Sequence, residues 1–185
     1  MSTMDTGAVR EALKPTERLL ELSEHIKRAQ QQMREHAQEM VKDGTKAIFA
    51  EYGDIVHSFG WLQYTPYFND GEPCEFGMHE LVVVAHEDLE GLDEFEAEER
   101  RSEWRYEGSP TFSHYGSDTK VRETFYGGDT NPNFDQRYKD AYDACVAIYE
   151  ALASDGQKLA RDVFGDHVEV IFTPQGVDVQ EYEHD

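Results

Sequence analysis

Apolar residues recur at alternating intervals of three and four along the N-terminal segment, and the positions between them are mostly polar. Such a/d spacing over about three heptads predicts a long helix from Thr16 to about Lys42. Residues 1–15 are expected to be loose. Asp43-Gly44 is expected to end or bend the helix, with a shorter helix over Thr45–Tyr52 after it. The stripe contains Leu19, Leu22, Ile26, Ala29, Met33, His36 and Met40.

This stripe is narrow, and Ala29 and His36 weaken its second half. A helix of this kind packs on its own domain, forms a coiled-coil dimer or binds a partner, and the pattern leaves all three open. Residues 16–42 are therefore a candidate segment for homo-oligomerisation. The chain divides into an N-terminal helical segment, residues 1–53, and an α+β domain, residues 54–185.

The segment 54–86 predicts a β-hairpin around Asp70-Gly71, the strongest turn signal in the chain. Its second strand contains the apolar run Leu81–Ala85, which is typical of a central strand covered on both faces. Its first strand, about Ile55–Phe68, does not alternate cleanly between apolar and polar residues. Gly60 permits close backbone approach or a bulge, and Pro66 indicates an edge strand or a break.

The remaining segments predict further helices and a second hairpin. Glu87–Glu103 is a charge run read as a short amphipathic helix or an acidic loop. The other predicted elements are short strands near 104–106 and 121–126, a helix from an Asn133 cap to about Ser154, a helix over 157–164 and a hairpin over 167–183. The fold class is α+β: an antiparallel sheet built from two hairpins, 54–86 and 167–183, with helices on one face and a long N-terminal helix.

Charge divides unevenly along the chain, whose net charge is −22. Residues 1–53 carry nine acidic and eight basic side chains, whereas residues 54–185 carry thirty acidic and nine basic ones. A surface this acidic disfavours direct binding to nucleic acid or to an anionic membrane and favours a protein partner with a basic surface, including through mimicry of a nucleic acid. Solubility or adaptation to salt explains the acidity equally well.

The chain shows no secretory signal and no apolar run long enough to span a bilayer. Cys74 and Cys145 are interpreted as separate, buried and reduced thiols, which fits a cytoplasmic protein.

Catalytic, metal and nucleotide signatures are weak. His57, His79, His86 and His114 show no metal-ligand spacing, and no nucleophile elbow or phosphate-binding loop is complete. We therefore expect no metal and no cofactor, and the sequence favours a protein that is not an enzyme.

The aromatic hairpin supplies the candidate binding residues. Aromatic rings, an amide and turn residues gather there, as they do in many binding surfaces, although the same residues suit an aromatic core. The candidates are Trp61, Gln63, Tyr64, Tyr67, Asp70 and His79.

The same segment carries a resemblance. GWLQYTPYFNDGEPCEF, within residues 59–76, resembles a motif in uncharacterised small proteins of tailed bacteriophages and some bacteria. The resemblance implies a phage-type accessory protein acting in the host cytoplasm, but no known fold, reaction or catalytic residue.

Three functional hypotheses follow. The first is a non-enzymatic acidic interaction protein that binds or inhibits a host or phage protein. The second is a small-ligand or nucleotide binder, or an enzyme, with a pocket at the aromatic hairpin. The third is a virion or assembly component that oligomerises through the N-terminal helix.

Overall fold

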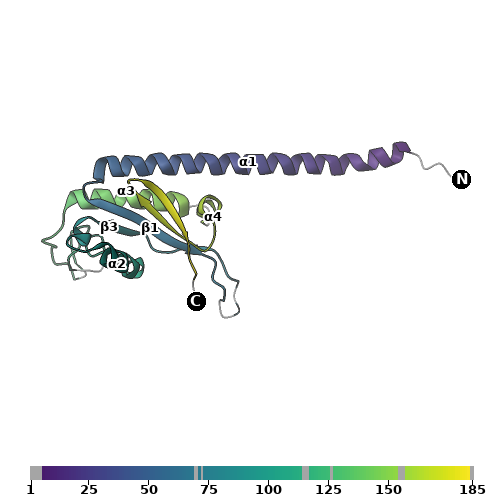
Figure 1. Cartoon of the computed structure of the whole chain (residues 1–185). Helices are drawn as coiled ribbons and strands as arrows, with labels where there is room; N and C mark the ends of the chain where they lie inside the picture. The colour runs from purple at the N-terminus through teal and green to yellow at the C-terminus, as the bar shows by residue number, and fades with distance from the viewer. Residues whose placement is uncertain are drawn as a thin grey trace.

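The computed structural model describes residues 6–68, 71, 73–113, 117–125, 127–153 and 157–183, without the side chains of residues 6–15, 17, 102 and 105–107. It confirms the predicted α+β class and the sheet built from two hairpins (Figure 1). The elements are α1 (Thr6–Tyr52), β1 (Val56–Tyr64), β2 (Gly77–Met78), β3 (Val82–Ala85), η1 (Glu87–Leu89), α2 (Glu94–Glu107), α3 (Gln136–Ala153), α4 (Lys158–Phe164), β4 (Val168–Thr173) and β5 (Gly176–Glu181).

Strand β1 lies at the centre of the antiparallel sheet. It pairs with β2 and β3 on one side and with β4 on the other, and β5 follows β4 at the edge. Of the two alternatives that Pro66 indicated, the edge strand was therefore wrong, whereas the break agrees with the end of β1 at Tyr64. Pro66 lies beyond this end and removes no hydrogen bond from the ladder.

Strand β3 was expected to be central, but β1 is its only strand partner among the described residues. Val83, Val84 and Ala85 are nevertheless buried, because other parts of the chain, α2 among them, cover the strand. Ser109 closes its outer edge, since its hydroxyl donates to the carbonyl of Val83 at 2.7 Å. A continuous apolar run thus marks burial on both faces but does not fix the position within the sheet.

Gly60 explains how β1 and β4 come so close. A Cβ atom at this position would lie 2.1 Å from the carbonyl oxygen of Val170 on the paired strand. The close backbone approach expected from the sequence is confirmed, and only glycine fits without a shift of the β4 backbone.

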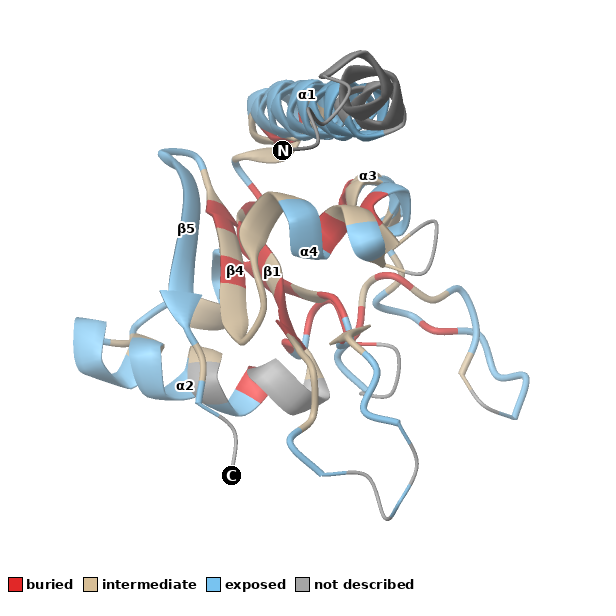
Figure 2. Cartoon of the chain, turned by 90° about the vertical axis from the view of Figure 1, so that its right-hand side faces the viewer, coloured by how far each residue is buried: buried red, intermediate tan, exposed pale blue. Residues whose placement is uncertain are grey.

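The sheet separates two layers of helices. Helices α1, α3 and α4 lie on one face, as predicted, but α2 does not join them and lies across the opposite face (Figure 2). The core between the sheet and the three helices is rich in aromatic and small apolar side chains, including Phe59, Trp61, Val83, Ala141, Cys145, Leu152, Val170 and Phe172.

Helix α2 confirms the helical alternative for the charge run, but it begins at Glu94, after Leu89 and Leu92, and continues through residues 104–106. Asp93 caps it by accepting from the Glu96 N–H at 2.9 Å, while the Glu96 carboxylate accepts from the Asp93 N–H at 3.0 Å. Trp104 is therefore a buried helical residue, and the strand predicted around it was wrong.

Helix α1 is one continuous helix, so the break expected at Asp43-Gly44 was wrong. Gly44 allows helix packing instead: a Cβ there would lie 3.3 Å from Ile148 Cδ1 on α3. The helix also begins at Thr6, inside the segment expected to be loose. Ile48 belongs to the core, so the last turns of α1 pack into the predicted 54–185 domain.

Several local predictions also need correction. Helix α3 begins at Gln136 and not after an Asn133 cap, because the Asp135 carboxylate accepts from the Arg137 N–H at 2.8 Å. Within residues 121–125, the described part of the strand expected over 121–126, the β-structure is an isolated bridge between Thr124 and Thr130. Cys74 is exposed and not buried, whereas Cys145 is buried, and burial raises the pKa of its thiol to about 12.

Candidate functional site

Trp61 and Gln63, two of the predicted binding residues, lie in the interior. Gln63 is fully buried, and its amide oxygen accepts from Trp61 Nε1 at 2.9 Å. Its amide nitrogen donates to the carbonyls of Gly165 at 2.6 Å and Ala160 at 3.3 Å. This amide therefore joins β1 to the end of α4, and both side chains hold the fold together.

Replacing Gln63 by leucine should destabilise the domain by roughly 2–4 kcal/mol, because it leaves the Trp61 N–H and two carbonyls without their partner. Urea denaturation would measure the change. The matched control is Gln180→Leu, whose side chain is exposed and which should change stability by less than about 0.5 kcal/mol. Equal stability of the two variants would contradict the role assigned to Gln63.

Tyr64, Tyr67 and His79 do come together, in a ring cluster at the end of β1. Tyr64 stacks on His79 with ring centroids 4.2 Å apart, and Tyr67 stacks on His167 at 4.7 Å. Tyr182 completes the cluster, 5.6 Å from Tyr64. The sequence did not indicate His167 and Tyr182 as members of this cluster. The pairing of β4 with β1 and β5 brings both beside Tyr64. The remaining candidate, Asp70, lies outside the described residues.

Asp166 anchors the loop beside this cluster. Its carboxylate accepts from the Thr65 N–H at 2.8 Å and from the Thr65 hydroxyl at 2.7 Å, and Arg161 lies 2.9 Å away. Burial raises the pKa of this carboxyl, but the hydrogen bonds from Thr65 and the charge of Arg161 outweigh it, so the net pKa is lowered. These contacts hold the loop around Asp166 against the end of β1. The Asp166 carboxylate therefore has a structural role.

Acid should remove the contribution of Asp166 to stability. A lowered pKa in the folded state means that this contribution is complete above the ordinary pKa of aspartate, about 4, and is lost as the pH falls through the lower folded value. The stability difference between wild type and Asp166→Asn should therefore shrink between pH 7 and pH 3 in urea denaturation. Asp162→Asn, at an exposed position on α4, is the control. A difference that did not change with pH would contradict this role.

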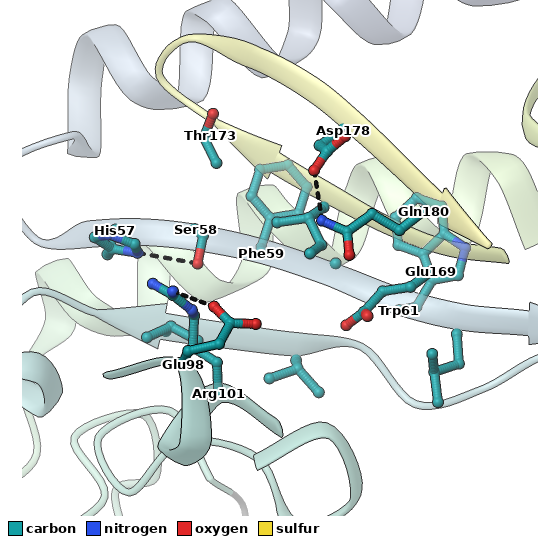
Figure 3. A pocket seen from close by; sticks show the side chains of 15 residues that line it. His57, Ser58, Phe59, Trp61, Glu98, Arg101, Glu169, Thr173, Asp178 and Gln180 are labelled. Atoms are coloured by element: carbon teal, nitrogen blue, oxygen red, sulfur yellow. Dashed lines mark hydrogen bonds and ion pairs between the residues drawn. The ribbon is translucent and has the colours of Figure 1, made fainter. Parts of the chain in front are cut away.

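A cavity of about 250 Å³ lies between α2 and the sheet (Figure 3). Residues 57–62 of β1 and alternate residues of β3, β4 and β5 line it, and Glu98, Arg101, Glu169, Asp178 and Gln180 contribute its charged and polar groups. Arg101 pairs with Glu98, and Gln180 donates to Asp178 at 2.7 Å. Ligand pockets usually span about 300–1,000 Å³, so this cavity is small for an organic ligand, and several of its polar groups pair with one another.

His57 lines the same cavity and is half-buried. Burial, followed by the charges of His86 and Arg101, lowers the pKa of its imidazole, which keeps it neutral at physiological pH. Its Nδ1 lies 3.1 Å from the Ser58 hydroxyl. In the part of the chain that the structure describes, no group of three His, Cys, Asp or Glu side chains is placed to hold a metal ion.

Helix α1 carries most of the large apolar side chains that are exposed among the described residues. Its N-terminal part projects away from the rest of the molecule, and only the part near its C-terminal end packs on residues 54–185, here called the body (Figure 1). The apolar stripe of the sequence begins on the projecting part and reaches the turn where Gln38 and Val41 contact the body. Its large side chains are between 49% and 67% exposed: Leu19, Leu22, Ile26, Met33 and Met40. Isolated exposed apolar residues are ordinary, but these five share the a and d positions of the heptads and so form one stripe, with Ala29 and His36 between them.

Carboxylates dominate the surface of the body. In the part of residues 54–185 that the structure describes, several Lys and Arg side chains make ion pairs with acidic residues, among them Arg100, Arg101, Lys120, Arg137, Lys139 and Arg161. With thirty carboxylates in the same segment, most of the negative charge has no basic side chain to offset it.

Comparison of this chain with protein-family models, with curated proteins and with solved structures found no match. No helix among the described residues is long and apolar enough to cross a membrane.

Proposed function

We propose that this chain is a non-enzymatic interaction protein whose helix α1 is a protein-binding surface. The observation that carries the proposal is the exposed heptad stripe of α1, a helix whose N-terminal part projects from the domain (Figure 1). Covering a large apolar side chain that was fully exposed stabilises a complex by about 1.5–3 kcal/mol, so even partial burial of several of them contributes substantially. The domain itself leaves this stripe uncovered.

The acidic body gives the protein a second means of attracting partners. Its charge favours a protein with a basic surface, such as a nucleic-acid-binding protein of a host or phage, and inhibition of such a protein is the sharpest form of this proposal. The resemblance of residues 59–76 to phage proteins supports an accessory role in the host cytoplasm.

A capture experiment with matched variants separates the two surfaces. Tagged wild type, Ile26→Asp and Gln31→Asp would be incubated at low and high salt with host lysate containing untagged copies of this chain. Ile26 lies in the stripe and Gln31 on the polar face of α1, and each substitution adds one negative charge.

A protein held by the stripe should be captured by wild type and by Gln31→Asp at both salt concentrations, and not by Ile26→Asp. A protein held by the acidic body should be captured by all three baits at low salt and lost at high salt, because salt screens exposed charges. The proposed role of α1 would be contradicted if no captured protein, the untagged chain included, depended on Ile26.

A further inference from the structure

We propose that the occupant of the α1 stripe is a second copy of this chain, paired antiparallel over residues 16–39. This inference rests on the proposed function, because it assigns the partner of the same surface. The segment 16–40 carries five acidic and four basic side chains, so two copies of it attract or repel each other little. The choice between parallel and antiparallel pairing then depends on the residues that meet in the seam, which is the line along which the two stripes contact each other.

Parallel pairing in register brings identical residues together. Ala29 would face Ala29 and leave a gap, and His36 would face His36 and place two imidazoles in the seam. Antiparallel pairing removes both defects. If Ile26 of one helix faces Ala29 of the other, Leu22 faces Met33 and Leu19 faces His36 in the same register. Each small or polar position then meets a large apolar one, which fills space better.

The residues beside the seam agree with this register. Arg18 and Glu39 occupy equivalent flanking positions in the heptads, and they come opposite each other at both ends of the antiparallel pair. In the parallel pair, Arg18 faces Ser23 and meets no opposite charge. Charge complementarity at the flanks therefore favours the antiparallel orientation.

The acidic bodies favour the same orientation. Each body, residues 54–185, has a net charge of −21 and is attached to the C-terminal end of α1. A parallel pair places the two bodies side by side, whereas an antiparallel pair places them at opposite ends of the paired helices. Like charges repel, and the repulsion falls with distance.

A distance between spin labels tests this orientation. Lys46 is exposed on α1, beyond the paired segment, so Lys46→Cys in a Cys74→Ser background carries one label on each copy. With a rise of 1.5 Å per residue, the antiparallel register places the two labels roughly 55 Å apart. Parallel helices, with axes about 10 Å apart, place them within about 25 Å of each other.

Pulsed electron–electron double resonance on the full-length chain should therefore give a distance between the two labels near the roughly 55 Å of the antiparallel pair. The signal should vanish on dilution with unlabelled protein and in the Ile26→Asp variant. A short distance would overturn the antiparallel orientation, and the absence of any dipolar signal would overturn the second copy as partner. Capture of a different protein that depends on Ile26 would still support the proposed function in either case.

Discussion

Replacing Gly60 by alanine is expected to destabilise the domain by roughly 3 kcal/mol or more. The new Cβ would lie 2.1 Å from the carbonyl oxygen of Val170, and that oxygen belongs to the backbone of a paired strand. A flexible side chain could rotate away, but β4 is held on both sides by β1 and β5. The strain is thus forced into the centre of the sheet.

Urea denaturation followed by tryptophan fluorescence would measure this loss, since Trp61 and Trp104 are both buried. Gly77→Ala is the matched control: the residue lies in β2 of the same sheet, and the nearest atom to its new Cβ is 3.9 Å away. The control should change stability by less than about 1 kcal/mol. Similar stabilities of the two variants would show that β1 and β4 do not approach as described.

Replacing Ile26 by aspartate is expected to weaken self-association of the chain by about 100-fold or more. The substitution puts a carboxylate into a seam that excludes water, at a cost of roughly 3 kcal/mol or more, and each 1.4 kcal/mol is a factor of ten in affinity. In the single chain Ile26 is half exposed, so the fold itself should be unaffected.

The concentration dependence of the sedimentation coefficient would measure this effect, with circular dichroism as the check on helix content. Gln31→Asp adds the same charge on the polar face of α1 and should leave association within a few-fold of wild type. An equal loss in both variants would point to net charge, and not to the stripe, as the cause.

The local elements were largely predictable from the sequence, because their signals are local. The heptad stripe predicted a long N-terminal helix, and the alternation of Val168, Val170 and Phe172 around a Thr173–Gly176 turn predicted the closing hairpin. Gly44 was misread because glycine serves two purposes, ending a helix or admitting a neighbouring one, and only the position of Ile148 on α3 distinguishes them.

Long-range relationships could not be predicted in the same way. The central position of β1 depends on pairing with β4, more than 100 residues later in the sequence. The same pairing turns Gln63 from a candidate ligand residue into a buried link to Ala160 and Gly165. It also brings His167 and Tyr182 beside Tyr64. No local spacing signals these contacts.

The molar mass of the purified full-length chain, measured by sedimentation equilibrium, tests the central claim about α1 most directly. At micromolar concentrations wild type and Gln31→Asp should reach twice the 21.3 kDa of one chain, and Ile26→Asp should remain at the mass of one chain. A wild-type mass of one chain at every concentration, together with no captured protein that depends on Ile26, would contradict the claim that this stripe is a protein-binding surface.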